Sequence, residues 1–138
     1  MPSVPVTGAS RRSRRRLQWT LAVLAAIPTT SAAREIVLGP RGVPGGSPEV
    51  TPTVDSALRY ANVFKLAVGP VMWSQVPRVD NNSPALTSVL AALFVGGLAR
   101  TWSWKQAGRP HPVSVTALGL ELLAPPVLIA WQRRVASR

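Results

Sequence analysis

The amino-acid sequence predicts an all-α protein, a four-helix transmembrane bundle that follows a disordered basic N-terminal tail. The first observation is the distribution of charge: the charged residues gather at the two ends of the chain and between four long apolar stretches. A helix of a soluble protein keeps one charged face, and most of these stretches carry almost no charge. The second observation is the arginines that flank the first and last stretches, as they do at the cytoplasmic ends of membrane spans. The chain of 138 residues suffices for one such domain, which we expect over residues 17–136.

The net charge of +11 suits either a nucleic acid or an anionic membrane surface as partner. The apolar stretches favour the membrane. We therefore expect the lipid bilayer as partner, with anionic headgroups at the basic ends, and no nucleic acid. A secreted or DNA-binding basic protein would require the apolar stretches to be a soluble core. The sequence has no cysteine, which excludes disulfides, thiolate metal sites and cysteine nucleophiles.

The first predicted span follows the basic tail. Residues 1–16 contain Pro, Ser and Arg without an apolar pattern, so we expect them to be disordered. Residues 17–33 carry no charge and just reach the minimum of about 17 residues for crossing a bilayer, and the span extends to about residue 38. A cleaved signal peptide is the alternative, because a basic segment, an apolar run and Ser31-Ala32-Ala33 resemble its parts. The later spans argue against a secreted soluble product.

The second predicted span, residues 57–76, has the weakest pattern. It follows a Pro- and Gly-rich segment, residues 34–56, which is typical of an irregular loop and whose last residues, Thr53 to Ser56, include candidate helix caps. Asn62 and Lys65 lie within the span, and a lysine at the centre of a membrane helix costs about 2.5 to 3.5 kcal/mol. Its neighbours and the topology, more than its own composition, identify this segment as a span.

The third and fourth spans are clearer. Residues 85–104 carry no charge before Arg100, and Glu121 is the only charged residue in the segment 113–132. Tryptophans lie at the end of both spans, where interfacial aromatic residues are common. The loop of residues 105–112 between them is short and contains two prolines, so the two helices should be antiparallel neighbours.

The basic residues predict a multi-pass protein of the cytoplasmic (inner) membrane with both termini in the cytoplasm. In this orientation nine basic residues lie on the cytoplasmic side: Arg11, Arg12, Arg14, Arg15, Arg16, Arg78, Arg133, Arg134 and Arg138. Six lie on the outer side: Arg34, Arg41, Arg59, Arg100, Lys105 and Arg109. The dense cluster before the first span should dominate, because charge near the first helix usually sets the orientation.

Glu121 is the first candidate for a functional residue, because a carboxylate inside a membrane span is costly. Antiparallel neighbours place Glu121 opposite Gly96-Gly97, with Arg100 one turn nearer the outer surface and within reach. Arg59 is a second candidate partner. We interpret the Glu121–Arg100 pair first as a structural ion pair. The alternatives are a proton or ligand site and a Glu121 that is protonated and uncharged.

The remaining candidate polar positions are Arg59, Arg109, His111 and Lys65. His111 is the only histidine, so a solvated loop residue is the simplest interpretation, with titration or ligand binding as the alternative. Lys65 either lines the bundle, extends to the interface or acts as a buried base. No nucleophile and base can be paired, so we expect no catalytic, metal-binding or cofactor-binding residues and no cofactor.

Several motifs of the C-terminal half resemble a family of small bacterial membrane proteins that is defined as a domain of unknown function. These motifs are GGLAR (96–100), GRPHP (108–112), ELLAPP (121–126) and WQRRVA (131–136). VDSALRY (54–60) is similar to the family's entrance to its second helix. The resemblance implies four helices and a membrane location, and it implies no activity.

The sequence leaves two functional hypotheses open. The first is a non-enzymatic accessory or structural component of the membrane. The alternative is a small transporter, a channel subunit or a ligand-binding membrane protein that uses Glu121 and Arg100 in a polar cavity. Four helices are few for a transporter, so transport would imply a homo-oligomer.

Overall fold

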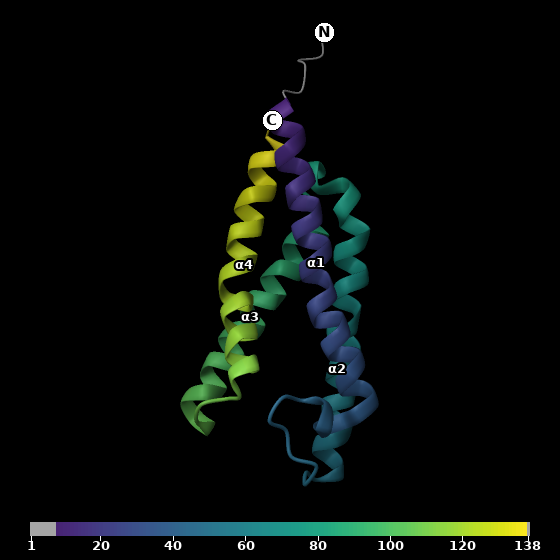
Figure 1. Ribbon diagram of the computed structural model, residues 1–138, viewed down its shortest axis with the longest axis vertical. Coiled ribbons are helices and arrows are strands. Elements are labelled where there is room, and N and C mark those ends of the chain that lie inside the picture. The colour runs from purple at the N-terminus through teal and green to yellow at the C-terminus, as the bar shows by residue number, and fades with distance from the viewer. Residues whose placement is uncertain (1–7, 138) are drawn as a thin grey trace.

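The computed structural model describes residues 8–137, which contain helices, turns and loops and no strand (Figure 1). The elements are α1 (Gly8–Leu38), η1 (Gly39–Gly42), α2 (Pro52–Gln75), η2 (Val76–Asn81), α3 (Pro84–Ala107) and α4 (Pro112–Ala136), where η denotes a 3-10 helix. Each predicted span falls on one α-helix, apart from Val76, which begins η2, and every helix starts before its predicted span. The prediction of an all-α fold with four helices is therefore confirmed.

The N-terminal tail differs from the prediction. Disorder was expected for residues 1–16, but α1 begins at Gly8, so the prediction is wrong for residues 8–16; residues 1–7 lie outside the described part of the chain. Arginine is a good helix former, and no proline interrupts this segment, so the helix continues outward from its buried part. The 31 residues of α1 extend over about 46 Å, which exceeds the hydrocarbon core of about 30 Å. α1 is therefore longer than a single crossing of a bilayer requires.

Three of the helices start in the same way, with a proline in the first helical position: Pro52, Pro84 and Pro112. A proline is well suited to this position because its missing N–H would have no partner there. The cap of α2 is Thr51, whose Oγ1 accepts a hydrogen bond from the backbone N–H of Val54. The N-cap of α2 therefore lies before the predicted candidates Thr53 to Ser56, and α2 begins five residues before the predicted span.

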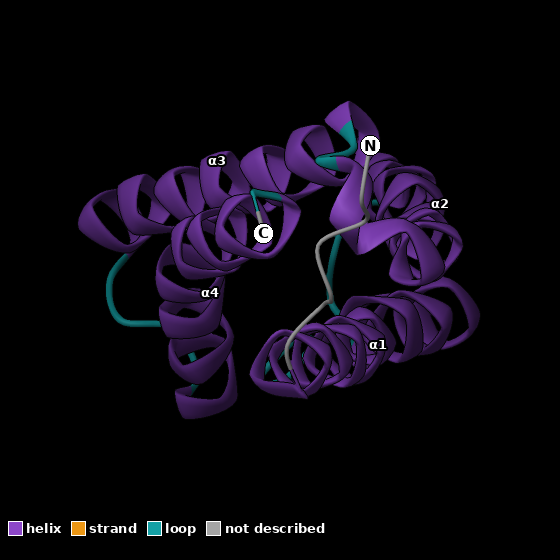
Figure 2. Cartoon of the chain, turned by 90° about the horizontal axis from the view of Figure 1, so that it is seen from above, coloured by secondary structure: helices purple, strands orange, loops and turns teal. Residues whose placement is uncertain are grey.

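The helices form two antiparallel hairpins, α1 with α2 and α3 with α4 (Figures 1 and 2). The hairpins meet at the end of the molecule where α1 begins and α4 ends, which we call the narrow end, and they diverge toward the opposite, wide end (Figure 1). The main core lies where the hairpins meet. Its buried residues come from all four helices and η2: Leu17, Leu21, Ala25, Met72, Val79, Leu86, Leu90 and Leu128.

Polar contacts also connect the elements at the narrow end. Arg14 donates to the carbonyl of Pro77 at 3.1 Å and lies 3.4 Å from a carboxylate oxygen of Asp80, which joins α1 to η2. The indole N–H of Trp131 donates to Ser13 Oγ at 2.9 Å, which joins α4 to α1. These contacts tie both hairpins together at the end where the core is buried.

Three helical stretches are long and apolar enough to cross a membrane: Arg11–Gly42, Pro84–Ala107 and Pro112–Ala136. The chain therefore has the helices of a membrane protein. α2 is not among the three, but the two polar residues in its middle, Asn62 and Lys65, are turned inward. Its inner face holds Asn62, Lys65, Gly69 and Met72, and its exposed face holds Tyr60, Val63, Phe64, Ala67 and Val71.

Candidate functional site

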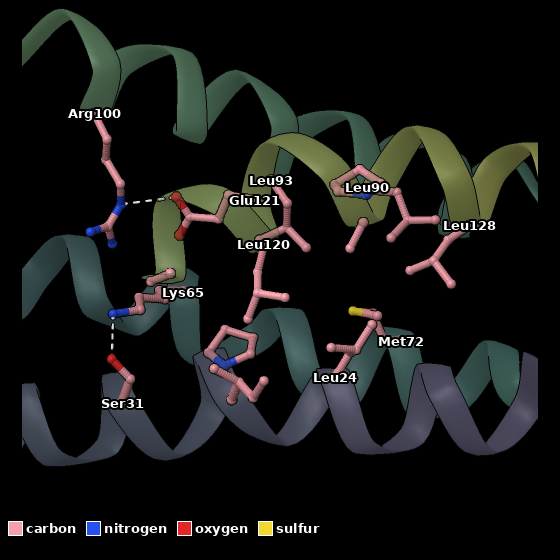
Figure 3. Close-up of a pocket in the computed structure, with 15 residues that line it drawn as sticks. Leu24, Ser31, Lys65, Met72, Leu90, Leu93, Arg100, Leu120, Glu121 and Leu128 are labelled. Atoms are coloured by element: carbon pink, nitrogen blue, oxygen red, sulfur yellow. Dashed lines mark hydrogen bonds and ion pairs between the residues drawn. The ribbon is translucent and has the colours of Figure 1, made fainter. Parts of the chain in front are cut away.

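A cavity of about 100 Å³ lies between the two hairpins and is lined by residues of all four α-helices (Figure 3). Most of its wall is apolar, and the labelled leucines and Met72 point into it from both sides (Figure 3). Charged side chains gather at one end of this wall: Lys65 from α2, Arg100 from α3 and Glu121 from α4. The cavity therefore combines an apolar wall with a polar end.

Arg100 and Glu121 form an ion pair, in the pairing that the depth argument predicts. Arg100 Nε lies 3.0 Å from Glu121 Oε2, and the side chains are 42% and 21% exposed. Gly97 makes this approach possible, because a Cβ atom there would lie 2.9 Å from Leu122 Cδ2 and 3.2 Å from Glu121 Cβ. At Gly96 a Cβ would meet no atom within 4 Å, so only one of the two glycines is needed for close packing.

The ion pair does not satisfy the hydrogen bonding of the carboxylate. Glu121 Oε2 is buried and has no hydrogen-bond partner among the described residues, although Arg100 Nε is near, because the guanidinium is not aligned with it. The terminal nitrogens of Arg100 also have no hydrogen-bond partner within residues 8–137. A buried acceptor without a hydrogen bond is uncommon in folded proteins, and it leaves Glu121 able to accept one from a further polar group.

Lys65 belongs to a second charged group, between α1 and α2. Its ammonium donates to Ser31 Oγ at 2.7 Å and to Glu35 Oε1 at 2.9 Å, while Ser31 donates to the same Glu35 oxygen at 2.6 Å. The Lys65 and Glu35 side chains are only 25% and 10% exposed. Lys65 thus lines the bundle, which is one of the expected alternatives, and its charge is balanced by α1.

Sequence reasoning missed Glu35 and Ser31 as members of the site. Both lie on one face of α1, four residues apart, and a lysine inside a span requires an opposite charge nearby. This pattern was available in the sequence. The register was not, because the connection between α1 and α2 is long and does not fix which residues of the two helices are level.

The other predicted positions lie outside the cavity. Arg59 was a candidate partner of Glu121; instead its Nε donates to Asp55 at 2.9 Å and its guanidinium donates to the carbonyl of Ile36, at the end of α1. His111 caps α4, its Nδ1 accepting from Val113 N–H at 3.3 Å. Arg109 is exposed in the loop before α4 and has no partner among the described residues.

His111 also marks the contact between the two hairpins at the wide end. A Cβ atom at Gly45 would lie 3.1 Å from His111 Cβ, so the irregular segment after η1 touches the start of α4. Gly45 has a φ of +72°, a conformation that favours glycine at this point. The segment therefore reaches from the α1–α2 hairpin to the α3–α4 hairpin at the wide end of the molecule.

Lys65, Arg100 and Glu121 line the cavity, and Glu35 pairs with Lys65 beside it, so the formal charges of these four side chains sum to zero. In the part of the chain that the structure describes, no three potential metal ligands lie together. The chemistry that this arrangement supports is binding: hydrogen-bond donors and one acceptor without a hydrogen bond lie at the end of an apolar cavity.

No curated protein and no solved structure matches the chain. A family described as "Domain of unknown function (DUF4345)" matches residues 16–132, which include all four helices and both charged groups of the cavity. The match confirms the resemblance to a domain-of-unknown-function family, and the chain therefore belongs to the DUF4345 family.

Proposed function

We propose that the protein is a non-enzymatic component of the cytoplasmic membrane that binds a single-chain amphipathic molecule between its two hairpins. The observation that carries this proposal is the apolar cavity whose one end holds Lys65, Arg100 and Glu121. An ion pair that served packing alone would be enclosed between its two helices. This pair instead lines a cavity, and Glu121 Oε2 keeps an unused acceptor position.

The size of the cavity restricts the ligand. Pockets for compact, drug-sized ligands measure about 300 to 1,000 Å³, several times the volume found here. A single hydrocarbon chain is narrow enough to enter, but about 100 Å³ holds only its first few carbons, which would lie among Leu24, Leu93 and Leu128. The rest of a longer chain would leave the cavity between the two hairpins. The polar head of the ligand, a carboxyl or hydroxyl group, would reach Arg100 and Glu121, which can donate and accept hydrogen bonds.

The proposal places all four α-helices across the membrane, with both termini in the cytoplasm. The inward orientation of Asn62 and Lys65 supports the crossing of α2, because its lipid-facing side is then apolar. The arginines of α1 and α4 at the narrow end support the orientation, since basic residues are enriched on the cytoplasmic side.

A binding experiment with a cavity-filling variant tests the proposal. The probe is cis-parinaric acid, a fluorescent C18 carboxylic acid, titrated into the full chain in detergent micelles. Ala117 lies one turn before Glu121 and lines the cavity, so Ala117→Phe should weaken saturable binding at least about tenfold, or about 1.4 kcal/mol.

The matched control is Ala99→Phe, which adds the same side chain at an exposed position of α3 and should leave binding unchanged. Equal binding by the wild type and Ala117→Phe, at equal melting temperature, would show that the probe does not enter the cavity. Binding no stronger than to empty micelles would reject the proposed function.

A further inference from the structure

A second site lies at the narrow end of the bundle, on the surface between α1 and α4. A groove there is lined by Arg12, Arg15, Arg16, Trp19, Thr20 and Trp131. We call it the arginine groove. It is separate from the cavity between the hairpins, and no residue lines both.

The spacing of these residues along α1 explains why they share a face. Positions 12, 15, 16, 19 and 20 recur at helical intervals, so their side chains lie on one side of the helix. Leu17 and Leu21 are buried on another side, and Arg14 is turned toward η2. The groove exists because α1 remains helical through its arginine-rich start, which no disordered tail would provide.

Charge in the arginine groove is unbalanced. Within residues 8–137, the guanidinium groups of Arg12, Arg15 and Arg16 have no ion pair or hydrogen bond, and no carboxylate lines the groove. Arg14, by contrast, is paired with Asp80. Three unpaired guanidinium groups on one face favour a phosphate, whose oxygens match the donor geometry of arginine.

The tryptophans place the groove at the level of lipid headgroups. Trp19 is 64% exposed. Trp131 is held against the first turns of α1 by its hydrogen bond to Ser13. Tryptophan rings favour the boundary between hydrocarbon and water, where phosphates of lipids lie. A soluble phosphate compound would gain nothing from these rings, whereas the glycerol and upper acyl chain of a lipid can pack on them.

We propose that the arginine groove binds the phosphate headgroup of an acidic glycerophospholipid from the bilayer. Basic pockets between membrane helices on the cytoplasmic side are suited to such headgroups. This inference requires the helices to cross the membrane, but it does not depend on any ligand in the cavity between the hairpins.

Native mass spectrometry of the full chain, released from micelles doped with phosphatidylglycerol, tests the assignment. The wild type should retain one phosphatidylglycerol in preference to phosphatidylcholine. The triple variant Arg12→Gln, Arg15→Gln, Arg16→Gln should lose at least about nine tenths of the bound fraction, since it removes the charges that contact the phosphate.

A second triple variant is the control for charge alone: Arg11→Gln, Arg78→Gln and Arg133→Gln remove three exposed arginines outside the groove. It should retain the lipid. Equal loss in both triple variants would overturn the assignment in favour of unspecific attraction. Displacement of the lipid by millimolar inorganic phosphate would also overturn it, because the groove would then select free phosphate. Equal melting temperatures of the two variants exclude unfolding as the cause.

Discussion

The two ion pairs beside the cavity differ in how fully their polar atoms are used. Lys65, Ser31 and Glu35 form a closed triangle in which one carboxylate oxygen receives two hydrogen bonds. Arg100 and Glu121 meet through a single contact, and Arg100 is nearly half exposed. The first group resembles a structural clamp between α1 and α2. The second retains hydrogen-bonding capacity, as a binding group needs.

Reversal of the Arg100–Glu121 pair should separate binding from packing. In Glu121→Arg two guanidinium groups face the cavity and the repelling carboxylate is lost, so the carboxylate of cis-parinaric acid should bind at least about tenfold more tightly. Adding Arg100→Glu restores one positive and one negative group with the opposite polarity. Binding should therefore return close to the wild-type value in the double variant, while the amount of protein in membranes remains close to that of the wild type in both variants.

The opposite pattern would identify a structural pair. If Glu121→Arg strongly reduces the amount of protein, Arg100→Glu restores it and neither change alters binding per folded protein, the pair serves helix packing and the proposed role in ligand contact is wrong. Quantitative immunoblots of isolated membranes give the amounts, and the fluorescence titration gives the binding constants.

At the scale of single elements, the contact of α2 with α1 depends on Gly69, which has no side chain to keep the two helices apart. A Cβ atom at Gly69 would lie 1.7 Å from Thr29 Oγ1 and 3.0 Å from the Ala25 carbonyl oxygen. Thr29 is itself fixed by a 2.8 Å hydrogen bond to that carbonyl. Close backbone approach at a glycine is the usual way in which membrane helices gain contact, and here it lies one turn from Lys65.

Gly69→Ala should therefore loosen the α1–α2 hairpin. Overpacking of this kind costs about 1 to 3 kcal/mol, which outweighs the gain of about 0.5 to 1 kcal/mol from the better helix former. The expected result is a lower melting temperature of the protein in detergent, measured by the loss of monodisperse protein on heating.

The matched control is Gly96→Ala on α3, where an added Cβ meets nothing within 4 Å. It should leave the melting temperature unchanged or raise it slightly. A similar decrease in both variants would show that glycine matters at these positions for a reason other than contact with α1.

The length of the loop between two helices decides whether the sequence could predict which of their residues are in contact. The short loop before α4 fixed the register of α3 and α4, and Glu121 lies against Gly97 as predicted. The longer connection before α2 fixed no register, so the partner of Lys65 was not found. The disorder predicted for residues 8–16 was wrong because composition alone ignores that a helix, once packed at Leu17, extends outward at little cost.

At the scale of the whole molecule, the proposed topology places the narrow end in the cytoplasm. A dual reporter, active as alkaline phosphatase outside and as β-galactosidase inside, should be fused after residues 45, 80, 108 and 138. The fusions at 80 and 138 should report the cytoplasm, and those at 45 and 108 the outer side. Four crossings with basic residues inside give this alternation.

The fusion at residue 80 is decisive for α2. An outer location there would mean that α2 does not cross the membrane, and both the four-span topology and the cavity between the hairpins would be wrong. Inversion of all four fusions would preserve the bundle but would assign the arginine groove to the other leaflet.

The divergence of the two hairpins has a mechanical consequence for the surrounding bilayer. A molecule that is narrow at one end and wide at the other displaces unequal areas of lipid from the two leaflets (Figure 1). With the proposed topology, the outer leaflet gives up more area than the inner one. Copies gathered in one patch would then act as wedges and favour a membrane that curves around their narrow ends, so that the density of the protein and the local curvature depend on each other.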